Sequence, residues 1–154
     1  MNSKKPLSLE LEKRLKPCPV DFKRVEYFVK RARKDLASAE LLSTTDLEAA
    51  YTLLYDGMLH AGLAFMAVSG IYPDVKGKHK TVVEYVAHKL GKGYESQMKF
   101  YDRMRRKRHQ FIYEPGPIGC TQKEMEEARQ AAQEFLKVIS ERIKEKSPQK
   151  ELEL

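Results

Sequence analysis

Hydrophobic residues recur at three- and four-residue steps along most of the chain, which is the spacing of an amphipathic helix. This pattern predicts five helices, at residues 22–42, 47–69, 80–90, 94–113 and 122–144. No window alternates hydrophobic and polar residues for long enough to predict a strand. The predicted fold class is therefore all-α, an up-and-down bundle of four to five antiparallel helices joined by short loops.

Residues that commonly begin helices stand at the predicted boundaries. Asp21 precedes the first long helix, and Thr45 or Asp46 precedes the second. Both positions are suited to an N-cap, where a side-chain oxygen accepts a backbone N–H. Thr121 followed three residues later by Glu124 predicts a capping box at the start of the last helix. These caps agree with the boundaries that the hydrophobic spacing gives.

The helix predicted at residues 47–69 is apolar on nearly all sides. Its apolar residues are Leu47, Ala50, Leu53, Leu54, Met58, Leu59, Ala61, Leu63, Ala64, Phe65, Met66 and Val68. A helix without a wide polar face is buried on several sides. We therefore expect this helix at the centre of the bundle, or with an oligomer interface on its outer face.

A chain of 154 residues fits one domain. We expect that domain at residues 20–146, preceded by a flexible arm at 1–19 and followed by a disordered tail at 147–154. The arm contains three prolines and several charges, and a short helix is predicted within it at residues 7–15.

Composition excludes several classes of protein. No apolar run approaches the ~18 residues of a membrane span, and the N-terminal residues lack the apolar region of a secretory signal. Cys18 and Cys120 are far apart and neither has a CxxC partner, which argues against a disulfide framework or a cysteine-rich zinc site. We expect a cytoplasmic protein with no metal site and no cofactor.

The net charge of +7 is informative mainly through its placement. The basic cluster comprises Arg103, Arg105, Arg106, Lys107 and Arg108, which fill five of six consecutive positions. On a helical wheel Arg103, Arg106 and Lys107 lie on or near a solvated face. Arg105 and Arg108 instead lie within the apolar stripe, because each is seven residues from another apolar position of the same helix.

A buried guanidinium without a partner costs several kcal/mol, since arginine cannot lose its proton. Three interpretations remain open for Arg105 and Arg108. They could pair with acids on neighbouring helices, such as Asp35, Glu40 or Asp56. They could line a cleft that receives an anion, with phosphate as the first candidate. Their stems could instead extend past the core and keep the charge in water.

The remaining histidines have ordinary structural interpretations. His60 lies among apolar residues one turn after Asp56, so we expect a hydrogen bond between the two. For His79 and His88, near the ends of a short helix, we expect a solvated or capping role rather than metal binding.

The segment Arg105–Tyr113, RRKRHQFIY, resembles the signature of HEPN domains (higher eukaryotes and prokaryotes nucleotide-binding). RKDLASAELL at 33–42 is similar to the first-helix pattern of that family, and YTLLYDGMLHAGLAFMAVSG at 51–70 is similar to its second helix. His79 matches a histidine often seen just before the third helix of the family. The resemblance covers about residues 21–140 and implies an all-helical bundle of this size.

In catalytic HEPN proteins the domain dimerises, and an arginine and a histidine of each protomer cleave RNA without a metal. Other members are toxins neutralised by minimal nucleotidyltransferase partners, or non-catalytic binding modules. If Arg108 is the signature arginine, Tyr113 stands where the catalytic histidine would be. If Arg103 is the signature arginine, His109 follows after five intervening residues. We favour Arg108, because it lies on the buried side of the helix.

The resemblance and the residues together give three hypotheses. The first is a non-catalytic HEPN module that binds nucleotide or RNA phosphate through Arg105, Arg108, His109 and Tyr113, as partner of a minimal nucleotidyltransferase in a toxin–antitoxin-type system. The second is a metal-independent HEPN ribonuclease or toxin, with His109 as its catalytic residue across a dimer interface. The third is a plain helical scaffold whose arginines only pair with acids. We also expect a homodimer built on the helices at 47–69 and 94–113.

Overall fold

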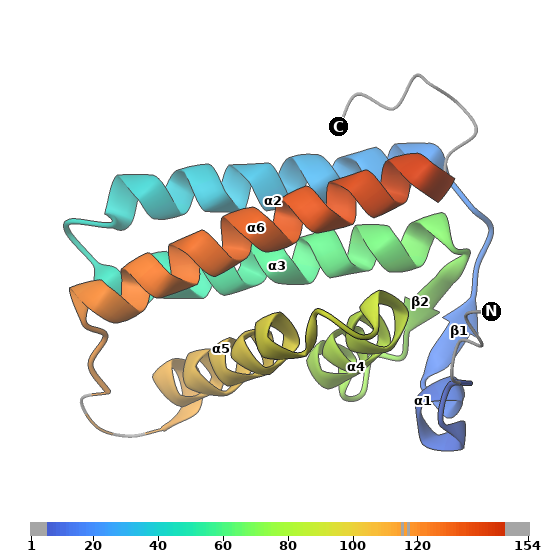
Figure 1. Ribbon diagram of the computed structural model, residues 1–154. Helices are drawn as coiled ribbons and strands as arrows, with labels where there is room; N and C mark the ends of the chain where they lie inside the picture. Colours follow the sequence, from blue (N-terminus) through green and yellow to red (C-terminus); the bar gives the residue numbers. More distant parts are fainter. Residues whose placement is uncertain (1–5, 115, 117, 147–154) are drawn as a thin grey trace.

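The computed structural model describes residues 6–114, 116 and 118–146. Its elements, in chain order, are α1 (Leu9–Lys13), β1 (Leu15–Pro17), α2 (Phe22–Leu42), α3 (Leu47–Val68), β2 (Ile71–Pro73), α4 (Lys78–Leu90), α5 (Glu95–Tyr113) and α6 (Gln122–Lys146), as Figure 1 shows. The tail expected at 147–154 and the first five residues of the expected arm lie outside the described residues.

The all-α fold class is confirmed, and each of the five predicted long helices is present as α2 to α6. Most boundaries agree within one or two residues of the hydrophobic pattern. The start of α4 is earlier than predicted because Gly77 adopts a left-handed conformation, with φ of 70°, and the helix begins directly after it. The helix α6 continues to Lys146, two residues beyond its predicted end.

The predicted N-caps form. The Asp21 carboxylate accepts a hydrogen bond from the backbone N–H of Lys23 at 3.0 Å. Asp46, rather than Thr45, caps α3 by accepting from the Ala49 N–H at 3.0 Å. Before α6, the Thr121 hydroxyl accepts from the Glu124 N–H while the Glu124 carboxylate accepts from the Thr121 N–H, which is the reciprocal capping box.

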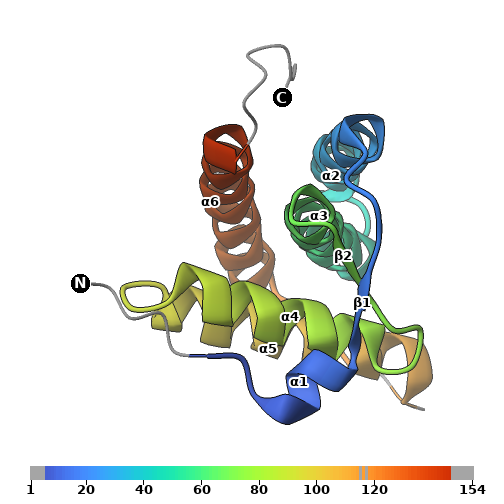
Figure 2. The ribbon, with the colours of Figure 1, turned by 90° about the vertical axis from the view of Figure 1, so that its right-hand side faces the viewer.

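The helix α3 lies at the centre of the molecule. Figures 1 and 2 show α2, α3 and α6 side by side, with α4 and α5 crossing beneath them on the other side of α3. The helix packs against α2, α6, α4 and α5, so its apolar surface is covered within one chain. The expected central position is confirmed, and the described fold leaves no outer apolar face on α3 that needs a second protomer.

Two glycines of α3 permit close approach of its neighbours. A Cβ at Gly62 would lie 2.5 Å from Cγ1 of Val82 on α4, and one at Gly57 would lie 2.3 Å from Cδ1 of Leu36 on α2. Both distances are shorter than van der Waals contact. These glycines therefore set how closely α4 and α2 pack against the central helix.

The described part of the arm forms a small sheet that the sequence analysis did not predict. The strand β1 pairs antiparallel with β2, with Leu15 opposite Pro73, and the Cys18 N–H donates to the Gly70 carbonyl at 2.8 Å. Beside it, Arg14 bonds the Thr81 hydroxyl at 2.9 Å on α4. The predicted short helix is present as α1. Strands of three residues are too short to give a detectable alternation.

No helix within residues 6–114 and 118–146 is both long and apolar enough to cross a membrane. The thiols of Cys18 and Cys120 are free.

Candidate functional site

The helix α5 presents its basic cluster on several sides. Met98, Tyr101 and Met104 are buried and hold the helix against the core. Beside this buried stripe lie Arg105 and Arg108, whose side chains retain only 24% and 23% of their exposure. The prediction that both arginines lie beside the apolar stripe of this helix is therefore confirmed, and both side chains are partly buried.

Arg108 lies against the central helix. Its Nε donates to Oδ1 of Asp56 at 3.0 Å, and its Cζ lies 5.5 Å from the ring centroid of Tyr55. Burial raises the pKa of Asp56 above its ordinary value, although the Arg108 charge acts in the opposite direction. The guanidinium is held by one ion pair and one cation–π contact, both from adjacent residues of α3.

The ion-pair partner of Arg105 is a residue of the same helix, α5. Its Nε donates to Oδ1 of Asp102 at 2.9 Å, while Oδ2 of the same carboxylate accepts from Nη2 of Arg106 at 2.8 Å. Its charge also acts on Tyr55 and Tyr101 across the core, where burial raises the pKa of both phenols. The charges of Arg105 and Arg108 therefore both act on the same buried tyrosine, Tyr55.

The pairing interpretation is realised in part. Asp56 is one of the three acids considered for these arginines, whereas Asp35 and Glu40 pair elsewhere, with Arg31 and Arg129. Neither Arg105 nor Arg108 is bound bidentately. In both, the hydrogen bond runs through Nε, and the terminal Nη1 and Nη2 make no hydrogen bond within the described ranges. Four N–H groups on each guanidinium thus remain to bind another ligand.

His79, for which we expected a solvated or capping role, lies beside these arginines. Its Nδ1 is 2.8 Å from the Tyr55 hydroxyl, and the two rings are close to coplanar, at 12°. Burial, assisted by the charges of Arg108, Lys78 and Arg105, lowers its pKa to about 4. Sequence reasoning missed this contact because it joins α3 to α4. The hydrophobic periodicity of a single helix does not show which of its residues face which residues of a neighbouring helix.

His109 and Tyr113 lie elsewhere on α5. Both side chains are exposed, and their rings are 4.6 Å apart. Within the described residues no hydrogen bond or ring contact joins either of them to Arg105 or Arg108. The arrangement follows from helical geometry, since His109 is rotated by about 100° from Arg108. The structure therefore distinguishes two partly buried arginines, each held by a carboxylate, from the exposed pair of His109 and Tyr113.

Two sequence predictions need correction. Lys107 is not on a solvated face: it forms an ion pair with Glu124 of α6, and its ammonium lies 5.6 Å from the ring centroid of Tyr51. His60 bonds Asp35 of α2, with Nδ1 to Oδ2 at 2.6 Å, rather than Asp56. Asp56 is taken by Arg108 on the other side of α3, which leaves His60 to the neighbouring helix.

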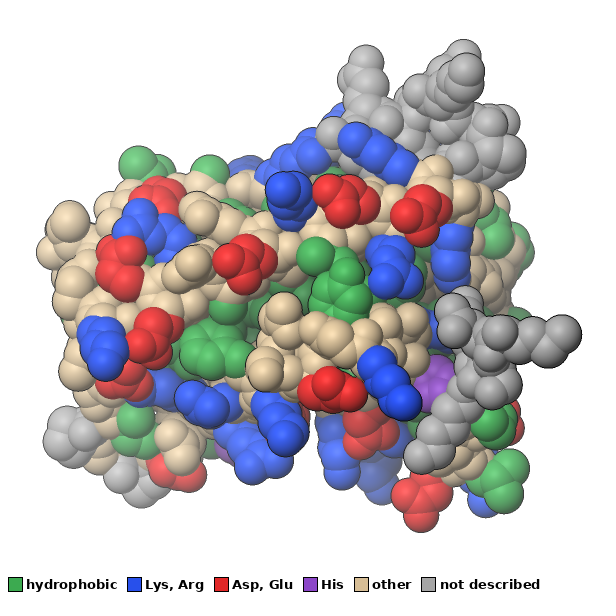
Figure 3. Space-filling model, viewed as in Figure 1, with side chains coloured by type: hydrophobic (Ala, Val, Ile, Leu, Met, Phe, Trp, Pro, Cys, Tyr) green, Lys and Arg blue, Asp and Glu red, His purple; other side chains and the backbone are tan. Residues whose placement is uncertain are grey.

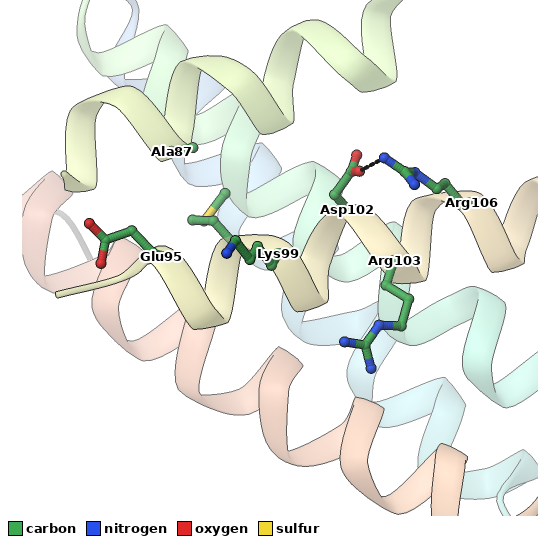
Figure 4. Close-up of a pocket in the computed structure, with 7 residues that line it drawn as sticks. Ala87, Glu95, Lys99, Asp102, Arg103 and Arg106 are labelled. Atoms are coloured by element: carbon green, nitrogen blue, oxygen red, sulfur yellow. Dashed lines mark ion pairs between the residues drawn. The ribbon is translucent and has the colours of Figure 1, made fainter. Parts of the chain in front are cut away.

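A groove between α4 and α5 has a volume of about 490 Å³. Its lining residues are Ala87, Glu95, Met98, Lys99, Asp102, Arg103 and Arg106. Figure 4 shows Asp102 joined to Arg106, with Arg103 extending to the other side of α5. Figure 3 shows Lys and Arg side chains gathered over α4 and α5. The groove excludes Arg105 and Arg108, and its two carboxylates oppose anion binding.

A metal centre has no support in this arrangement. Among residues 6–114, 116 and 118–146, no group of three or more His, Cys, Asp or Glu side chains could hold a metal ion. The site is therefore described by its guanidiniums, its carboxylates, Tyr55 and His79.

Comparison with known proteins places the chain in a family. No curated protein and no solved structure matches the chain. The model of the HEPN domain matches residues 25–143, which span α2 to α6 and the whole of the basic cluster. The chain therefore belongs to the HEPN domain family.

Proposed function

We propose that this protein is a non-catalytic HEPN module that binds the phosphate of a nucleotide or RNA through Arg105 and Arg108. The observation that carries the proposal is the way both guanidiniums are held. Nε of Arg105 donates to Asp102 at 2.9 Å, and Nε of Arg108 donates to Asp56 at 3.0 Å. The terminal N–H groups of both side chains make no hydrogen bond within the described residues. A guanidinium fixed at one edge presents the other edge to a ligand.

Partial burial strengthens such a site. A charge–charge interaction weakens as the effective dielectric rises, so an anion binds better to guanidiniums that are mostly removed from water than to fully exposed ones. The carboxylates neutralise part of the charge and also fix its direction, which lowers the entropy lost on binding. The arrangement favours a phosphate group over a diffuse polyanion.

The exposed position of His109 argues for binding rather than cleavage. Acid–base catalysis requires a proton-transferring group within hydrogen-bond reach of the scissile phosphate. His109 and Tyr113 are exposed, with rings 4.6 Å apart, and no hydrogen bond joins His109 to either partly buried guanidinium within the described residues. The phosphate-binding residues of the proposal are therefore Arg105 and Arg108, whereas His109 and Tyr113 are exposed and held by neither carboxylate.

Titration with inorganic phosphate and with 5′-AMP, followed by calorimetry or NMR, tests the proposal. Arg105→Gln and Arg108→Gln should each weaken binding by about tenfold or more, which corresponds to one charge-assisted hydrogen bond. Arg106→Gln is the matched control: it removes the same charge from the same helix, at a side chain that is 71% exposed, and should leave the affinity within about threefold.

Equal losses in all three variants would mean that only the overall charge matters, and no binding by the wild type would refute the proposal. The salt dependence should also be shallow, because a single phosphate releases few counterions.

We further propose a cytoplasmic homodimer that pairs with a minimal nucleotidyltransferase in a toxin–antitoxin-type system. Membership of the HEPN family supports this partner class. Co-expression with a nucleotidyltransferase encoded beside the gene should give a complex that co-elutes in gel filtration. Separate elution of the two proteins at micromolar concentration would refute the pairing.

A further inference from the structure

Tyr55 and His79 form a hydrogen-bonded pair next to the guanidinium of Arg108. We propose that His79 is the third donor of the anion site, and that its Nε2–H, oriented by Tyr55, binds the same phosphate as Arg105 and Arg108. This inference rests on the proposed phosphate site. It adds one binding residue from α4 and one positioning residue from α3.

The proton on the imidazole can be located from the burial of its partner. Tyr55 is fully buried, so its hydroxyl hydrogen needs an acceptor inside the protein. Nδ1 of His79, at 2.8 Å, is the hydrogen-bond partner of this hydroxyl within the described residues. If the hydroxyl donates, Nδ1 is the acceptor, and the proton of the neutral ring must be on Nε2. His79 therefore presents an N–H at its outer edge.

The surrounding charges keep this donor neutral. Lys78 of α4 and Arg105 and Arg108 of α5 oppose protonation of the ring and, together with burial, lower its pKa to about 4. Asp56 and Asp102 are occupied by the arginines. A neutral N–H adds a hydrogen bond to a phosphate without adding a repelling charge beside two guanidiniums.

The same neutrality limits what His79 can do chemically. An imidazole with a pKa of about 4 is unprotonated at neutral pH, so it supplies no acidic proton to a leaving oxygen. With Nδ1 occupied by Tyr55, it also lacks a free basic nitrogen. The inferred role is binding and orientation, which agrees with a non-catalytic module.

One tyrosine connects the two sides of the site. The Tyr55 ring lies 5.5 Å from Cζ of Arg108, and its hydroxyl contacts His79. Tyr55 itself packs against Tyr101, with ring centroids 5.7 Å apart. Because this ring is buried on the central helix, it holds the α4 donor and the α5 guanidinium at a fixed separation.

Two isosteric substitutions separate the ring nitrogens. In His79→Gln the side-chain amide nitrogen can occupy the place of Nε2, whereas in His79→Asn it can reach only the place of Nδ1. In a titration with inorganic phosphate, we expect His79→Gln to retain the affinity within about threefold and His79→Asn to lose about tenfold. Equal affinities for wild type and His79→Asn would overturn the inference.

The positioning role of Tyr55 has a readout independent of ligand. In ¹⁵N-detected NMR of the wild type, His79 should show the Nε2–H tautomer from pH 5 to 8. In Tyr55→Phe the tautomers should mix, and phosphate affinity should fall by about the same factor as in His79→Asn. An Nδ1–H tautomer in the wild type would overturn the assignment, even if phosphate binds.

The failures of the two proposals are distinguishable. Loss of binding in Arg105→Gln and Arg108→Gln, together with no effect of His79→Asn, retains the proposed function and overturns the third donor. No phosphate binding by the wild type overturns both. Circular dichroism and thermal unfolding of each variant show that it is folded, so that a loss of affinity is assigned to the site.

Discussion

His79 shows how one residue can link the proposed site to the pH dependence of stability. Its pKa is about 4 in the folded protein against an ordinary value of 6.5, so between these values the unfolded state binds more protons. Stability should therefore rise as the pH increases from about 4 to 6.5, by about 1–2 kcal/mol after allowing for solvent screening of a half-buried ring.

The variant His79→Gln, which cannot titrate in this range, should flatten the urea-unfolding free energy across the same interval. An identical pH slope in wild type and His79→Gln would contradict the assigned environment of His79.

Asp35 is the most deeply buried carboxylate described, with a side chain that is 3% exposed, and it is held by His60 at 2.6 Å and by Nε of Arg31 at 3.3 Å. Replacing His60 with leucine should cost about 2–4 kcal/mol, because it leaves a buried carboxylate poorly paired. The double variant with Asp35→Leu should recover much of that loss. Chemical denaturation of the two single variants and the double variant measures the coupling, and additive losses would show that the pair is not a unit.

At the residue scale, the sequence predicted those features that depend on the periodicity of a single helix. The wheel placed Arg105 and Arg108 at the buried side of α5, and Asp56 was among the acids considered for them. It could not identify Asp35 as the partner of His60, or Tyr55 as the partner of His79, because each contact joins two helices. Which of several acids and rings meets a given side chain depends on the crossing of helices, which periodicity does not encode.

At the scale of elements, the sequence predicted the long helices well because two local signals agree. Hydrophobic spacing and the caps at Asp21, Asp46 and Thr121 indicate the same boundaries. The strands β1 and β2 lack such agreement. They are three residues long and are stabilised by each other and by the contacts of Arg14, so only the assembled structure reveals them.

The close packing of α3 against α4 gives a test at this scale. Gly62→Ala would place a methyl group 2.5 Å from Cγ1 of Val82, whose β-branched side chain has little rotamer freedom in a helix. We expect a net loss of about 1–2 kcal/mol, since overpacking outweighs the better helix propensity of alanine. Adding Val82→Ala should restore stability relative to the sum of the single variants. Thermal unfolding measures this cycle, and a stabilised Gly62→Ala would refute the close approach.

At the scale of the whole molecule, the apolar character of α3 is explained within one chain. Its neighbours α2, α4, α5 and α6 cover it, so the part of the expected dimer interface assigned to residues 47–69 is already buried. The end of α5 remains available, where Ile112 and Tyr113 are 46% and 68% exposed. An exposed aliphatic and aromatic pair on a basic helix is the feature that a second protomer would cover.

A homodimer should therefore form through the end of α5. Light scattering at micromolar concentration should give the mass of two chains for the wild type. Ile112→Asp should shift it toward one chain, because a charge would be buried at the interface. Leu41→Asp, at an equally aliphatic but 81% exposed position on α2, is the control and should leave the mass unchanged. A monomer mass for the wild type would contradict the dimer.

The assembled protein should not cleave RNA. Metal-independent cleavage of RNA needs a proton-transferring group and a cation at the same phosphate. In the fold, the Arg108 guanidinium lies over Tyr55, which bonds a neutral His79, and Arg105 is held by Asp102, whereas His109 and Tyr113 are exposed. His109 is the residue directly after Arg108, so within each protomer the two side chains diverge by about 100° around α5. Association of two protomers through the end of α5 does not change this angle.

Tyr113, five residues after Arg108, is exposed, and a phenol is a poor substitute for a histidine in general acid–base catalysis. Single-stranded RNA incubated with the protein in EDTA should therefore remain intact, or be cleaved no faster than by the Arg105→Gln/Arg108→Gln double variant. Efficient cleavage that is abolished by His109→Ala, and retained by His88→Ala, would show that Arg103 and His109 are the working pair. Such a result would place an active centre on the solvent-exposed side of α5 rather than on the side that packs against α3.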